Sequence, residues 1–142
     1  MLNPVKKPIK QTKKKKTKRK KSEHKKLEEK CLDLWSDCVI TRDRTCRNCN
    51  SDEYLSAHHI RSISNHNTMF DINNGICLCW RKCHFPQKYH PEKFQDMVLS
   101  IIGEEHYNQM KYKSLIVRDW TVEDLRNKKE ELKLKLEELK NE

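Results

Sequence analysis

Residues 77 to 84 read CLCWRKCH, and together with TCRNCN at residues 45 to 50 they decide the fold. Two cysteine pairs lie in these stretches with two and three residues between their members: Cys46 with Cys49, and Cys79 with Cys83. Zinc prefers four thiolate or imidazole ligands in a tetrahedron, and cysteines at these spacings can wrap one side of it. The sequence therefore predicts a structural Zn²⁺ site, with Cys77 as an alternative to Cys79.

The composition also favours a bound metal that stabilises a small hydrophobic core. Charged residues make up 37% of the 142 residues and hydrophobic residues 35%, so few large apolar side chains are available for burial. No apolar run is long enough for a membrane span or follows the N-terminal lysines as in a secretory signal. We therefore predict a cytoplasmic protein, whose paired cysteines are metal ligands rather than disulfide partners. Cys31 and Cys38 are instead interpreted as small buried hydrophobic residues.

Positive charge is concentrated at the N-terminus. Residues 1–30 hold 14 Lys/Arg against 3 Asp/Glu, which accounts for the whole net charge of +10. Residues 1–21 are predicted to be a disordered arm that lies on nucleic-acid phosphates. A solubilising tail or a nuclear-import signal is the alternative. The predicted contacts are Lys13, Lys14, Lys15, Lys16, Lys18, Arg19, Lys20 and Lys21.

Apolar periodicity predicts several helices and two short strands. Ser22 suits the cap of a first helix, whose buried stripe is Leu27, Cys31, Leu34, Trp35 and Cys38. Pro91 and Gly103 suit the ends of a second, with an apolar face of Phe94, Met97, Val98, Ile101 and Ile102. Residues 104–112 suit a short helix, and SLIVRDW (114–120) is expected to be extended and to pack on the core. Residues 52–60 suit a loop that leads into a short strand, and residues 76–80 suit a second short strand or a tight knuckle.

A last amphipathic helix is predicted after Thr121, which with Asp124 resembles an N-terminal cap. Its leucine stripe is Leu125, Leu132, Leu136 and Leu139. A stripe this narrow can pack on its own domain or pair with another chain, and the sequence leaves both open. A homodimer or a phage or host protein partner would bind through this helix.

The motifs occur in a familiar order: CRNCN, SAHHI, NNGICLC and a final CH. In this order, over about residues 38 to 110, the chain resembles HNH endonucleases of the ββα-metal, or His-Me finger, superfamily. More narrowly, it resembles their phage-type zinc-knuckle members and, more loosely, the NinG/Rap recombination nucleases. The resemblance implies an α+β fold, with a zinc-stapled ββα-metal, treble-clef-like core flanked by helices. The expected organisation is an arm (1–21), a nuclease domain (22–118) and a C-terminal helix (119–142).

The resemblance also implies residue roles. His59 would be the general base, and Asn74 would orient the base or its loop, with neighbouring Asn73 as the alternative. His58 and His84 would bind the catalytic metal, and His90 could replace His84. One departure is that the last knuckle is C-x3-C-H, one residue longer than the usual C-x2-C-H, which could rotate His84.

These roles imply a DNA endonuclease that hydrolyses phosphodiester bonds with one divalent metal, Mg²⁺, Mn²⁺, Ni²⁺ or Co²⁺. A histidine titrates near neutrality, so a neutral imidazole can accept the proton of an attacking water. If the protein is phage-encoded, it would act in the host cytoplasm. The alternative hypothesis is a non-catalytic zinc-knuckle protein that binds nucleic acid through its lysine arm.

Overall fold

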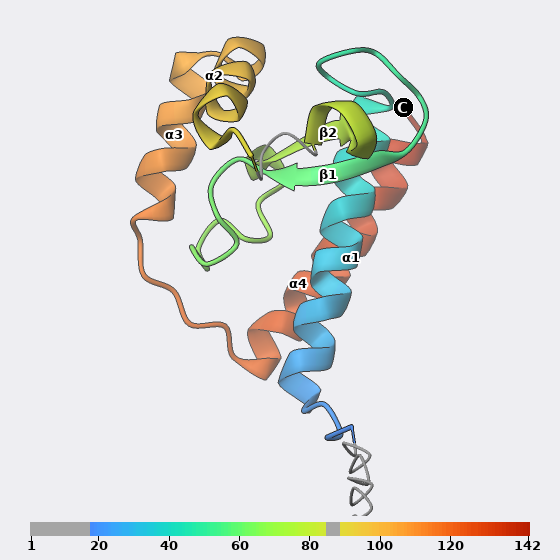
Figure 1. Cartoon of the computed structure of the whole chain (residues 1–142). Helices are drawn as coiled ribbons and strands as arrows, with labels where there is room; N and C mark the ends of the chain where they lie inside the picture. The colour runs from blue at the N-terminus through green and yellow to red at the C-terminus, as the bar shows by residue number, and fades with distance from the viewer. Residues whose placement is uncertain (1–17, 85–88) are drawn as a thin grey trace, which may run out of the picture.

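The computed structural model describes residues 18–84 and 89–142. The elements in chain order are α1 (Glu23–Asp43), β1 (Leu55–His59), η1 (Ile72–Asn74), β2 (Gly75–Cys79), η2 (Trp80–His84), α2 (Pro91–Ile102), α3 (Glu104–Ser114) and α4 (Val122–Lys140). The two strands form an antiparallel sheet. Figure 1 shows this sheet between α1 and the pair α2 and α3. The predicted α+β class is confirmed.

The longest helices, α1 and α4, lie side by side and run in the same direction (Figure 1). Two buried thiols of α1 mark the register: Cys31 Sγ donates to the Leu125 carbonyl at 3.4 Å, and Cys38 Sγ to the Leu132 carbonyl at 3.5 Å. Burial raises the pKa of both thiols to about 11. The two cysteines are therefore buried packing residues, as predicted, and α4 uses its leucine stripe within the chain.

The helix starts follow the predicted caps. Ser22 Oγ accepts a hydrogen bond from the Lys25 amide at the start of α1. Thr121 and Asp124 form a reciprocal capping box at the start of α4. These side chains satisfy amide groups that have no partner within the helix, which fixes where each helix begins.

Polar contacts join the end of α1 to the start of β2. The Arg42 guanidinium donates to the carbonyls of Ile72 and Gly75, both at 2.8 Å. Asp43 Oδ2 accepts a hydrogen bond from the Cys77 amide at 2.9 Å. Successive side chains of β2 point to opposite faces of the sheet. Cys77 packs with the α1–α4 core on one face, whereas Ile76 and Leu78 pack with α2 on the other. The sheet thus separates two apolar cores.

Helix α2 covers the second face of the sheet, and α3 packs against α2. Pro91 lies in the first turn of α2 and Gly103 ends the helix, as predicted. Phe94 and Val98 are buried in the core against β2. The short helix predicted over residues 104–112 is α3.

The connection between α3 and α4 corrects one prediction. The sequence predicts that Leu115, Ile116 and Val117 pack on the core, but their exposed fractions are 68%, 58% and 91%. Only Trp120 at the end of the segment packs inward, with its ring centroid 5.0 Å from that of Phe70. The α1–α4 pair already fills that side of the core, so the linker crosses from one helix to the next outside it (Figure 1).

None of the helices in residues 18–84 and 89–142 has the length and apolar character to cross a bilayer. Residues 1–17, and with them the arm contacts Lys13, Lys14, Lys15 and Lys16, lie outside the described residues.

Candidate functional site

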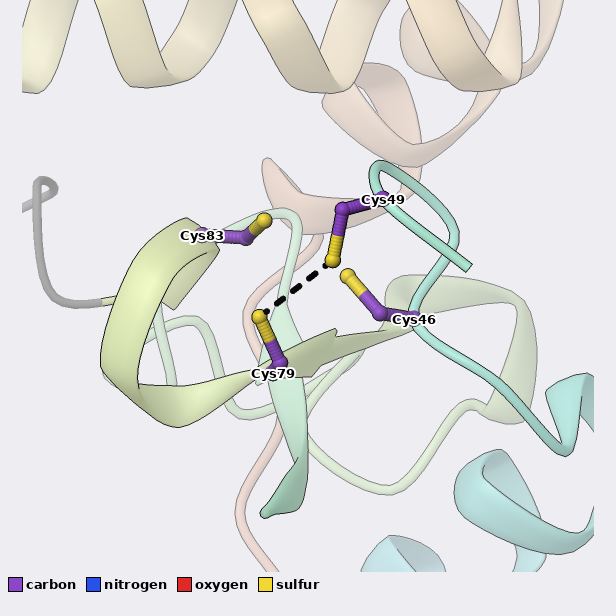
Figure 2. Close-up of side chains that lie close together, drawn as sticks. All are labelled: Cys46, Cys49, Cys79 and Cys83. Carbon is purple, nitrogen blue, oxygen red and sulfur yellow. Dashed lines mark hydrogen bonds between the residues drawn. The ribbon is translucent and has the colours of Figure 1, made fainter. Parts of the chain in front are cut away.

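Four cysteine side chains from two segments converge beyond the end of α1. Cys46 and Cys49 lie in the turn before β1, while Cys79 ends β2 and Cys83 lies in η2. Figure 2 shows their sulfur atoms pointing toward one another, and each sulfur atom lies within 4.8 Å of the other three. Sulfur ligands about 2.3 Å from one zinc would be about 3.8 Å apart, so a small contraction suffices. The four thiols could therefore hold a structural metal such as zinc.

The electrostatics of this cluster also suit a cation. Burial disfavours the Cys46 thiolate, but backbone N–H groups of Cys49, Cys79 and Asn48 donate to it and lower its pKa to about 7. Burial raises the pKa of Cys83 to about 12. Thiolates this close repel one another, so only some ionise unless a cation compensates them. Cys77, the alternative ligand, faces the α1–α4 core and lies outside the cluster.

His58 and His84 form a second group of potential metal ligands. His58 Nδ1 lies 3.1 Å from His84 Nε2, close to the roughly 3.0–3.4 Å between two nitrogens that bind one cation at about 2.1 Å. Burial, then the charges of His84 and His59, lower the pKa of His58 to about 3. A neutral imidazole is the metal-binding form. The pair therefore fits a divalent cation by distance and by donor chemistry.

A hydrogen-bond chain sets the tautomer of His84. Ser56 Oγ lies 3.0 Å from His84 Nδ1, and its own proton goes to the Leu78 carbonyl at 3.2 Å. Ser56 can therefore only accept from the ring, which places the proton on Nδ1 and leaves the Nε2 lone pair facing His58.

The long C-x3-C-H knuckle forms one helical turn that ends at His84. Residues Trp80–His84 form a single π-helical turn, which holds one more residue than an α-helical turn. His84 is the last residue of this turn and lies against His58. His90, the alternative ligand, occupies the N-cap of α2 and is exposed.

His59 points to the opposite face of β1 from His58, because side chains alternate along a strand. Its ring stacks on Trp35 with centroids 3.7 Å apart and planes at 11°. Gly75, its partner on β2, permits this approach, since a Cβ there would come within 2.7 Å of the Trp35 ring. Nothing local in the sequence links Trp35 or Gly75 to a histidine, so neither could be predicted as a site residue.

A backbone carbonyl fixes the tautomer of His59. Its Nε2 lies 2.9 Å from the Met69 carbonyl, which can only accept, so Nε2 carries the proton. The lone pair is then on Nδ1, and burial lowers the pKa of this imidazole. His59 is therefore held as a neutral ring with one basic nitrogen.

Asn74, rather than Asn73, holds the loop that follows β1. It is fully buried, and its Oδ1 accepts from the Arg61 amide at 2.8 Å. Its Nδ2 donates to the carbonyls of Arg61 and Thr68, at 3.1 and 3.0 Å. Thr68 precedes Met69, so Asn74 also fixes the carbonyl that orients His59. The side chain of Asn73 takes no part in these contacts.

One cavity of about 470 Å³ unites the histidines. His58 and His59 both line it even though they leave the strand on opposite faces, because β1 ends at His59 and opens into the loop. His84, Arg61 and Tyr107 line it as well. No carboxylate is among the described residues of its wall.

The described part of the arm lies away from this cavity. Lys18, Arg19, Lys20 and Lys21 are exposed beside the N-terminus of α1, at the other end of that helix from the sheet (Figure 1). Lys21 pairs with Glu29 at 2.7 Å.

Comparisons with protein-family profiles, with curated proteins and with solved structures found no match for this chain.

Proposed function

We propose that this chain is a metal-dependent DNA endonuclease of the ββα-metal type, which hydrolyses phosphodiester bonds. The observation that carries the proposal is the convergence of two arrangements in one cavity: His59, with its basic Nδ1, and the facing nitrogens of His58 and His84. In this hypothesis β1, β2 and the segment that begins at η2 are the ββα-metal unit.

His59 is the general base. Its Nδ1 accepts a proton from a water molecule as the water oxygen forms a bond to phosphorus. The Met69 carbonyl, already hydrogen-bonded to Nε2–H, stabilises the imidazolium that results. Because Asn74 and the Trp35 stack hold the ring and its loop, little reorganisation is needed during the step.

His58 and His84 would hold the catalytic cation. The chemistry that a divalent cation would supply there is neutralisation of charge on the phosphate and stabilisation of the departing oxygen. Two neutral imidazoles leave its charge uncompensated, and the described cavity wall offers no carboxylate, so an anionic phosphate is a suitable further ligand. Imidazole ligands favour Mn²⁺, Co²⁺ or Ni²⁺ over Mg²⁺.

A plasmid-nicking assay tests this proposal. The full chain is dialysed free of loosely bound metal, since a strong chelator would also remove the structural zinc, and is assayed with and without Mg²⁺, Mn²⁺ or Ni²⁺. We expect conversion of supercoiled plasmid to the open circle only with added metal. Binding without nicking under every metal would contradict the proposal and favour the non-catalytic nucleic-acid-binding alternative.

The N-terminal arm is predicted to supply affinity without sequence preference. Removing residues 1–21 should weaken DNA binding and flatten the dependence of log Kd on log salt, by about 0.9 for each phosphate that the arm neutralises in the full chain. Ser22 and its cap remain in this variant, so helix α1 should be intact by circular dichroism. An unchanged salt slope in the truncated protein would refute the role of the arm.

A further inference from the structure

Among the described residues that line the cavity of the three histidines, one has a permanently charged side chain, Arg61. The described wall has no carboxylate to offset the guanidinium. A partly buried cation in a low-dielectric wall attracts anions more strongly than one in open solvent. The cavity is therefore electrostatically suited to an anion even without a metal.

Arg61 is held in place but not neutralised. Asn74 clamps its backbone from both sides, through the amide and the carbonyl. Its side chain makes two long hydrogen bonds to neutral groups, Nε to Ser114 Oγ at 3.3 Å and Nη1 to Tyr107 Oη at 3.4 Å. No ion pair joins it to any carboxylate in residues 18–84 or 89–142. A guanidinium has five donors, so most of its capacity remains for a ligand.

Tyr107 of α3 offers a second donor beside Arg61. Its hydroxyl oxygen accepts from Arg61 and also from Gln95 Nε2, at 2.6 Å. With both lone pairs engaged, the phenol can only donate its own proton to a further partner, and no acceptor for it is found in the described part of the chain. Guanidinium and phenol therefore present donors, and no acceptor, to one cavity.

We propose that Arg61 and Tyr107 form a phosphate subsite, which binds an anionic oxygen of the nucleic-acid backbone next to the histidines. Planar guanidinium groups bind phosphate oxygens through paired, charge-assisted hydrogen bonds. The subsite would position the backbone before the chemical step. This inference rests on the proposed function, because it takes the ligand of the cavity to be a nucleic acid.

Equilibrium binding tests the subsite without any cleavage. The full chain carrying His59→Ala is titrated with a fluorescein-labelled duplex oligonucleotide, without added divalent metal, at several salt concentrations. Adding Arg61→Ala should weaken binding roughly 10- to 100-fold and reduce the salt slope by about 1. Arg61→Lys should keep the slope but bind more weakly than arginine, because an ammonium lacks the planar fork. Tyr107→Phe should weaken binding by a smaller factor and keep the slope.

Two matched controls separate the subsite from general effects. Arg118→Ala removes the same charge from an arginine that stacks on Trp120 outside this cavity. Tyr112→Phe removes the hydroxyl of an exposed tyrosine on the same helix. Each control should lose less DNA-binding affinity than the corresponding variant in the cavity. Equal losses of affinity in Arg118→Ala and Arg61→Ala would overturn the proposal.

The remaining outcomes are also decisive. If Arg61→Ala does not fold, Arg61→Gln keeps a donor for Ser114 and Tyr107 but removes the charge, and it should lower the slope equally. An unchanged slope in a folded Arg61 variant would overturn the subsite, even if the wild-type protein nicks DNA. Conversely, a lowered slope in an Arg61 variant of a protein that never nicks DNA would support the subsite and refute only the nuclease.

Discussion

Cys79→Ala is expected to abolish tight zinc binding and to unfold the sheet. Three of the four clustered cysteines belong to the core between β2 and α2, which is otherwise built from only four buried apolar residues among those described: Ile76, Leu78, Phe94 and Val98. Structural zinc contributes about 10–16 kcal/mol to folding in small zinc-binding units, as much as the whole stability of a typical domain. Without it, we expect hydrogen-exchange protection of β1 and β2 to disappear.

Helices α1 and α4 should respond less, because their leucines and thiols form a separate core. The measurements are zinc content per chain and amide exchange, and chelation of the wild-type protein should reproduce the result. Cys77→Ala is the matched control, since this buried thiol faces α1 and should leave the zinc content unchanged. A wild-type protein that carries no tightly bound metal, or a Cys79→Ala variant that keeps it, would contradict the assignment.

His59→Ala should reduce metal-dependent nicking by roughly 10²- to 10⁴-fold, the usual contribution of a general base. The variant loses the Nδ1 lone pair and also the stack on Trp35, so its thermal stability should fall somewhat. His59→Gln is the sharper test, because an amide N–H can still reach the Met69 carbonyl but cannot act as a base.

In both variants zinc content should equal that of the wild-type protein, which separates an effect on the chemistry from an effect on the fold. His66→Ala is the control, since this exposed loop histidine lies outside the cavity and its change should leave the nicking rate intact. Nicking by His59→Gln at the wild-type rate would exclude His59 as the base.

Several features could be predicted because they depend on spacing along one element or one short segment. Ser22, Thr121 and Pro91 mark helix starts through the preferences of the first turn. The cysteine pairs could be recognised by spacing, since a knuckle is a local structure. Side chains alternate between the two faces of β1, so His58 and His59 can share one site only if the strand ends there. The sequence does not show where the strand ends, and so it left this question open.

The exposed segment at residues 115–117 shows the limit of a purely local argument. Three β-branched or aliphatic residues in a row predict burial, but burial also requires an unoccupied surface of the core. Leucines of α4 already occupy the nearest one. The sequence carries no signal for that competition, because it is settled between segments far apart in the chain.

By itself, the sequence determined the helices, their caps, the four-cysteine frame and the adjacency of His58 and His59. These depend on periods of two or 3.6 residues and on chemical type. The tertiary structure decided which partner each group meets: Cys79 rather than Cys77, Asn74 rather than Asn73, and α1 as the partner of the leucine stripe. It also placed Arg61 and Tyr107 beside the histidines. Such choices depend on strand register and helix packing. Both are determined by contacts between segments that are far apart in the chain, as these segments bury their apolar faces together.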